Sequence, residues 1–162
     1  MIDTNGCISS FAGLTFDEKT HTYCLNNILL PSVTTVMQPL SAAVYGGIDR
    51  EVMAKAAEKG TSVHQSIENF IRYGIEDVNP DYRTYYKAFQ SFWDTAHPTP
   101  IATEIRLYHK FLMYAGTGDL LCEIDGKTVL IDYKTTAQLN PMLTRVQLEA
   151  YAKALESHGM HI

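Results

Sequence analysis

The sequence lacks the features of secreted, membrane and disordered proteins. Among its 162 residues there are only three cysteines, Cys7, Cys24 and Cys122, and their odd number and wide spacing exclude a disulfide framework and a CxxC metal pair. No hydrophobic run approaches the roughly 18 residues that span a bilayer, and the first ten residues lack the basic start and hydrophobic stretch of a signal peptide. We therefore expect a cytoplasmic protein without membrane association and with reduced thiols.

Positive charge is also scarce, because 13 Lys and Arg side chains face 18 Asp and Glu side chains and give a formal net charge of −5. This balance argues against a protein that coats nucleic acid through bulk positive potential. The deficit is uneven: residues 1–80 hold 5 basic and 9 acidic side chains, whereas residues 81–162 hold 8 and 9. Any contact with phosphates is expected to be modest and salt-dependent. The side chains available for it in the second half are Arg83, Lys87, Arg106, Lys110, Arg145 and Lys153.

The composition, with 46% hydrophobic and 19% charged residues, is typical of a globular protein. The length of the chain suits a single domain of the α/β (α+β) class. Residues 1–47 are expected to form an N-terminal extension of short strands, at 14–16, 21–25 and 28–30, followed by loops. Residues 49–97 are expected to be helical, and residues 101–157 to hold a sheet and a closing helix from Asn140-Pro141.

Within the helical segment, Lys59-Gly60 is expected to stop a first helix, and Thr61 or Ser62 to begin a second one that Gly74 closes. Asn79-Pro80 predicts a third helix. That third helix carries an aromatic stripe with helical spacing, which is tempting as a platform for stacking bases but is interpreted as core. The stripe consists of Tyr82, Tyr85, Tyr86, Phe89, Phe92 and Trp93.

The most informative stretch is GDLLCEIDGKTVLIDYKT, at residues 118–135. Asp125-Gly126 is a strong signal for a two-residue hairpin turn, and this turn sets Asp119 opposite Asp132. Directly opposed carboxylates repel each other unless a positive charge lies between them, so the register predicts a divalent cation. Strand periodicity places Lys134 on the same face as Asp132.

Mg²⁺ or Mn²⁺ suits such a site, because these hard cations prefer carboxylate oxygens and also admit phosphate oxygens. The cation can activate water and stabilise a phosphoryl group under attack, while Lys134 orients the water or neutralises phosphate. Glu104, from the preceding strand, can join as a ligand or accept from a bound water. The Tyr133 carbonyl is a further candidate oxygen ligand. Together these groups describe phosphodiester hydrolysis.

At these residues the sequence resembles the PD-(D/E)XK nuclease superfamily, in its RecB-type and phage-exonuclease branch, over most of the chain. The resemblance implies a restriction-endonuclease-like core, a central mixed sheet flanked by helices, with an N-terminal hairpin and helical extension. It also implies that His64, Asp119 and Asp132 hold metal and that Lys134 is catalytic. The matching pieces are Gly60-Thr61 with His64 and Glu68, Glu104, GTGDL around Asp119, IDYKT around Asp132 and Lys134, and Gln147 with Tyr151.

Three of these residues also have plainer interpretations. Glu68 lies one helical turn from His64 and is expected to orient it. Gln147 and Tyr151 form the QxxxY element that lines the DNA-facing site in the resembled family. Gln147 could instead hydrogen-bond a strand edge, and Tyr151 could belong to the core.

We expect a Mg²⁺- or Mn²⁺-dependent deoxyribonuclease, an exonuclease of phage type, acting on DNA and associated with phage recombination proteins. The alternatives are a structure-selective or restriction-type endonuclease on the same fold and a non-catalytic DNA-binding module. No iron–sulfur cluster is expected, because no cysteine follows the QxxxY segment. Because relatives continue beyond the point that corresponds to Gly159, the chain is also expected to be a truncated form.

Overall fold

The computed structural model describes residues 10–162, in which strands and helices come in groups. The elements of this range are, in order, β1 (Leu14–Asp17), β2 (Thr22–Leu25), β3 (Ile28–Leu30), α1 (Val33–Val36), α2 (Gln38–Tyr45), α3 (Arg50–Tyr73), the 3₁₀ turn η1 (Pro80–Tyr82), α4 (Arg83–Ala96), β4 (Thr99–Tyr108), β5 (Ala115–Ile124), β6 (Lys127–Ile131) and α5 (Pro141–Ser157). The predicted mixture of helices and strands is confirmed. No helix of the described range is long and apolar enough to cross a membrane.

The first sheet is an antiparallel meander in the order β1-β2-β3, whose strands lie close to the three predicted ranges. Its buried side chains, Leu14, Tyr23, Leu25 and Leu30, pack against Ala115 at the start of β5. The meander is therefore anchored on the second sheet. Residues 1–9 of the predicted N-terminal extension, and Cys7 with them, lie outside the described residues.

The second sheet, in the order β4-β5-β6, carries the hairpin that the sequence predicted. Its pairs run from Ile124 with Lys127 to Leu120 with Ile131, and Asp125 and Gly126 have φ angles of 51° and 72°. Positive φ at both turn residues is what a type I′ hairpin requires. The sequence analysis treated Asp132 and Lys134 as part of this strand, but β6 ends at Ile131 and both residues follow it.

The expectation of a mixed sheet is wrong for the described residues, since all strands of both sheets pair antiparallel. Parallel contact is limited to two single-residue bridges, Ser10 with Arg106 and Ser32 with Ala115. The reason lies in the connections. The strands of each sheet follow one another through short turns, whereas a parallel pair needs a crossover of about a dozen residues or more.

Two predictions for the helices are also corrected. Residues 50–73 form one continuous helix, α3, with Gly60 inside it and only Gly74, at φ 67°, ending it. An interior glycine costs about 1 kcal/mol against alanine, which the packing of Val63 and Ile67 offsets. The segment expected to be loop-rich contains α1 and α2, because Pro39 falls in the first turn of α2, where its missing N–H costs nothing.

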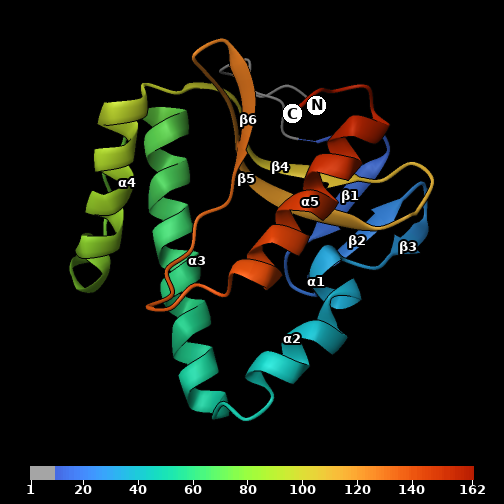
Figure 1. Ribbon diagram of the computed structural model, residues 1–162, viewed down its shortest axis with the longest axis horizontal. Coiled ribbons are helices and arrows are strands. Elements are labelled where there is room, and N and C mark those ends of the chain that lie inside the picture. The colour runs from blue at the N-terminus through green and yellow to red at the C-terminus, as the bar shows by residue number, and fades with distance from the viewer. Residues whose placement is uncertain (1–9) are drawn as a thin grey trace.

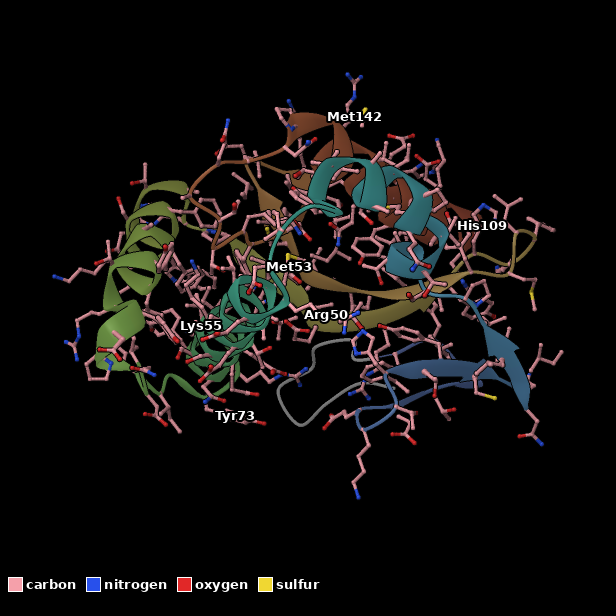
Figure 2. All side chains as sticks on the ribbon, turned by 90° about the horizontal axis from the view of Figure 1, so that it is seen from below. Arg50, Met53, Lys55, Tyr73, His109 and Met142 are labelled. Atoms are coloured by element: carbon pink, nitrogen blue, oxygen red, sulfur yellow. The ribbon has the colours of Figure 1, made fainter. Side chains whose placement is uncertain are left out.

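The helices surround the second sheet on different sides. In Figure 1, α5 crosses in front of β4 and β5, while α3 and α4 lie side by side next to the β5–β6 hairpin. Figure 2 looks along α3 and shows Met53 and Lys55 at its near end, within residues 50–58, which are all exposed.

The aromatic stripe of α4 packs against Val63 and Ile67 of α3, so its interpretation as core is confirmed.

Candidate active site

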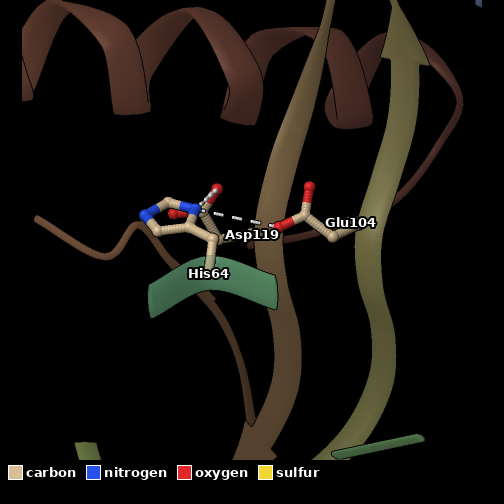
Figure 3. Close-up of side chains that lie close together, drawn as sticks. All are labelled: His64, Glu104 and Asp119. Atoms are coloured by element: carbon tan, nitrogen blue, oxygen red, sulfur yellow. Dashed lines mark ion pairs between the residues drawn. The ribbon is translucent and has the colours of Figure 1, made fainter. Parts of the chain in front are cut away.

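His64, Glu104 and Asp119 come together from α3, β4 and β5 (Figure 3). The imidazole Nδ1 lies 3.6 Å from Asp119 Oδ1 and 3.8 Å from Glu104 Oε1, and one donor atom from each residue falls within 4.8 Å of the others. The second ring nitrogen, Nε2, is 3.1 Å from the Tyr133 carbonyl oxygen. We call these three residues the carboxylate–histidine cluster.

The two carboxylates of the cluster occupy matching positions on neighbouring strands. The flanking pairs are Thr103 with Leu120 and Ile105 with Gly118, so Glu104 lies across from Asp119. Glu104 has a φ of 49°, a left-handed conformation that is strained for a residue with a side chain. Such strain persists where the surrounding structure fixes the backbone, and it gathers at functional sites. Here the ladder pairs before and after Glu104, Thr103 with Leu120 and Ile105 with Gly118, hold it in place.

Burial and charge together perturb the titration of this cluster. Burial by itself lowers the pKa of His64, but contact with Glu104 and the charge of Asp119 outweigh it and raise the pKa above its usual range. Burial raises the pKa of the Asp119 carboxyl, and the charges of Asp132 and Glu104 add to this against the opposing effect of His64. The Tyr133 N–H, which donates to Asp119 Oδ2 at 2.6 Å, favours the charged form. Two carboxylates, Glu104 and Asp119, thus share one imidazole.

Asp132 and Lys134 follow β6 and connect the cluster to α5. Asp132 is one register step beyond the last pair, Leu120 with Ile131, and therefore beside Asp119, as predicted. Its carboxylate, with only 4% of the side chain exposed, lies 2.5 Å from Lys134 Nζ. Lys134 also donates to Gln147 Oε1 at 3.0 Å, and Gln147 donates to the Tyr151 hydroxyl at 3.1 Å. We call this sequence of contacts the Lys134 chain.

Tyr151 is part of the core and also contacts Gln147, whereas its role in a DNA-facing site stays a prediction. Its ring is 4% exposed within the cluster under α5, and its hydroxyl reaches Gln147. Burial raises the pKa of this phenol well above its usual range. The ring packs on the bare backbone of Gly116, where an added Cβ would be 2.5 Å from Tyr151 Cε1. The glycine before Thr117-Gly118-Asp119 therefore makes room for the end of the Lys134 chain.

Two residues, Glu68 and Asp132, make different contacts from those that the sequence predicted. Glu68 does not contact His64 but pairs with Arg72, one turn further along α3, at 2.8 Å. An i,i+4 partner on the same helix was available to it, and the imidazole has Glu104 and Asp119 instead. Asp132 is not among the three residues whose donor atoms cluster, because its carboxylate turns to Lys134. A ligand role for Asp132 and for the Tyr133 carbonyl stays a prediction.

A cleft of about 620 Å³ opens beside the cluster, and His64, Glu68 and Glu104 line it. Residues of the β1–β2 hairpin also line this cleft, and the sequence analysis did not predict that the hairpin reaches the site. No motif linked the hairpin to the site, although the spacing of Glu104 and Arg106 on one strand was a signal that both could share a face. The lining residues that the sequence analysis did not name are Phe16, Glu18, His21, Gln65 and Thr117, and Arg106, named there only for contact with phosphates, also lines the cleft.

A scan against protein-family models finds no match, and a search of curated protein sequences finds no significant match.

Proposed function

We propose that this chain is a metal-dependent nuclease that hydrolyses phosphodiester bonds in DNA, with a restriction-endonuclease-like core as its fold. The observation that carries the proposal is the convergence of His64, Glu104 and Asp119 next to the ion pair of Asp132 and Lys134. These five residues come from four segments of the chain and occur in the order and spacing of the PD-(D/E)XK pattern that the sequence resembles.

The donor set of the cluster fits a divalent cation. Two carboxylates and one imidazole offer the oxygen and nitrogen ligands that Mn²⁺ accepts, and the carboxylates also suit Mg²⁺. Distances of 3.6 and 3.8 Å from the imidazole to the carboxylates are too long for good hydrogen bonds, so the three groups do not satisfy one another fully. A bound cation would supply a more acidic water and stabilise negative charge at the phosphate.

Lys134 supplies the chain's own contribution to hydrolysis. Its ammonium group is fixed from two sides, by the Asp132 carboxylate and by Gln147 Oε1, and about a third of the side chain is exposed. A fixed cation beside an ion site stabilises charge that develops on a phosphate, with little reorganisation during the reaction. We assign Lys134 this role, with Gln147 and Tyr151 holding it in position.

The experiment is a metal-dependent cleavage assay on end-labelled single-stranded and double-stranded DNA, with covalently closed DNA in parallel. We expect cleavage of linear DNA with Mg²⁺ or Mn²⁺ and no cleavage in EDTA, with Lys134→Ala as the blank. Cleavage of closed circles would favour the endonuclease alternative. DNA that is bound but remains uncut with both metals would overturn the proposal in favour of a non-catalytic DNA-binding module.

A further inference from the structure

The β1–β2 hairpin brings an aromatic ring and a carboxylate to Arg106, which lines the cleft. The Arg106 guanidinium lies over the Phe16 ring, 5.2 Å from its centroid, and 3.5 Å from Glu18 Oε1. The hairpin is tied to β5 at the same place, because the Tyr23 hydroxyl and Thr117 Oγ1 form a hydrogen bond of 2.8 Å. Arg106 is thus positioned by contacts that span two sheets.

Arg106 stands two residues beyond Glu104 on β4, and both side chains line the cleft. Ile105 and Leu107, which alternate with them, are fully buried in the core under α5. This alternation directs Arg106 to the side of the sheet that holds the carboxylate–histidine cluster. A group held by Arg106 would therefore lie next to that cluster.

The charges along the cleft single out Arg106. Its other charged or titratable lining residues are Glu18, Glu68 and Glu104 together with His21 and His64, so Arg106 is the only Arg or Lys among the described lining residues. A DNA strand that enters an acidic cleft needs at least one cation for its phosphates. The planar guanidinium is suited to this, because it binds phosphate oxygens in pairs and keeps its charge at any working pH.

Glu18 is a weak partner for Arg106. Its side chain is 81% exposed, the Arg106 side chain is 38% exposed, and the contact of 3.5 Å is long for an ion pair. Exposed pairs of this kind contribute little to stability. The Phe16 ring holds the guanidinium from one face and leaves its edge available. An incoming phosphate can therefore replace the Glu18 carboxylate without loss of the stacking contact.

We propose that Arg106 is a phosphate-binding residue for the DNA strand in the cleft, held in place by Phe16, and that Glu18 occupies the phosphate position in the absence of DNA. This inference rests on the proposed nuclease function and names the residue that positions its substrate. The bound group is a phosphate, either at a 5′ end or within the strand.

The test compares steady-state cleavage of a linear duplex by the intact chain and by its Arg106→Gln variant over a range of salt concentrations. Loss of a charge-assisted contact is expected to raise KM about tenfold or more, with a smaller effect on kcat. The slope of log binding against log salt should become shallower by about one, as for the loss of one phosphate contact. Arg50→Gln, the same change on the exposed start of α3 outside the cleft, is the matched control and should leave KM unchanged.

Glu18→Gln gives an opposite expectation that a structural role would not produce. Removing the competing carboxylate should lower KM, while the free energy of unfolding stays close to that of the unaltered chain because the pair is exposed. Arg106→Lys, which keeps the charge but loses paired hydrogen bonding and stacking, should fall between Arg106→Gln and the unaltered chain.

A 5′-phosphorylated and a 5′-hydroxyl duplex distinguish the two sources of phosphate. If Arg106 holds a terminal phosphate, the intact chain prefers the phosphorylated end and Arg106→Gln loses this preference. If it holds an internal phosphate, the variant weakens both substrates equally. Equal KM values for Arg106→Gln and Arg50→Gln, or a higher KM for Glu18→Gln, would overturn the inference while cleavage by the intact chain upholds the nuclease. No cleavage by the intact chain would overturn both.

Discussion

The carboxylate–histidine cluster and the Lys134 chain meet at the same sheet but differ in how their charges are compensated. In the cluster, two carboxylates share one imidazole at 3.6 and 3.8 Å. In the chain, consecutive groups are in contact at 2.5, 3.0 and 3.1 Å, from the Asp132 carboxylate to the Tyr151 hydroxyl. The cluster is left with excess negative charge, whereas in the Lys134 chain the Asp132 carboxylate is balanced by the Lys134 ammonium.

This difference separates two tasks that a hydrolytic site has to combine. A group of donors that do not satisfy one another can take up a cation without first breaking strong contacts. A fully connected polar chain holds one side chain in a single position, which lowers the cost of reorganisation during a reaction. Variants in each half should therefore fail in different ways.

The largest effect is expected for Asp119→Asn, which breaks the cluster. The amide keeps the size of the side chain but removes the central negative charge, so Mn²⁺ binding and cleavage should both be lost. A bound cation stabilises the charge of the transition state by several kcal/mol, so its loss should lower the rate by about three orders of magnitude. Calorimetric titration with Mn²⁺ and the cleavage assay measure the two effects, and Asp94→Asn, on the exposed face of α4, is the control. Retained Mn²⁺ affinity in Asp119→Asn would place the ion elsewhere.

Lys134→Ala is expected to break the chain and leave the cluster intact. Cleavage should fall by about 10²- to 10³-fold, as when one preorganised donor is removed from an active site, while Mn²⁺ affinity is retained. Because the Asp132 carboxylate is then left buried without its cation, the variant should also lose stability, by about 1–3 kcal/mol.

The double variant Lys134→Ala/Asp132→Asn separates the two consequences. It should regain most of the lost stability, measured by urea unfolding, because no buried charge is left unpaired. Cleavage should stay low. Recovery of activity together with stability would show that Lys134 acts only through the folded structure and would remove it from the chemistry.

Gly116→Ala tests the far end of the Lys134 chain, where Tyr151 packs on the glycine backbone. The added Cβ would be 2.5 Å from Tyr151 Cε1, so the ring must move. Overpacking of this kind costs about 1–3 kcal/mol, and a displaced hydroxyl would release Gln147. We expect lower stability and a lower kcat with unchanged Mn²⁺ affinity. Gly47→Ala, where an added Cβ meets nothing within 4 Å, is the control.

Much of this comparison could be predicted from local sequence signals. The Asp125-Gly126 turn fixed the register that brings Asp119 to Asp132, and the QxxxY spacing placed Gln147 and Tyr151 on one side of α5. Both predictions depend on short-range geometry, in which the number of intervening residues determines the neighbours.

The rest depends on tertiary contacts that no local pattern encodes. Whether Asp132 joined the cluster or turned to Lys134 was decided by competition among buried charges, and the left-handed backbone at Glu104 could not be read from its neighbours. The approach of the β1–β2 hairpin to Arg106 joins residues about 90 positions apart. Helix continuity through Gly60 was missed because tertiary packing overrides a weak local preference.

Gly60→Ala tests whether α3 is continuous through Gly60, and its expected effect is the smallest. Gly60 lies one turn before His64, so the continuity of α3 decides how firmly the cluster's imidazole is held. An alanine Cβ at this position would meet only Thr135 Oγ1, at an ordinary 3.7 Å. If α3 is continuous, alanine should stabilise the chain by up to about 1 kcal/mol, with Mn²⁺ affinity and kcat unchanged. If the helix instead broke at Gly60, alanine would favour a helical backbone where the chain needs a turn, and stability would fall. Thermal unfolding with and without Mn²⁺ therefore distinguishes a histidine on one rigid helix from a histidine at the start of a separate one.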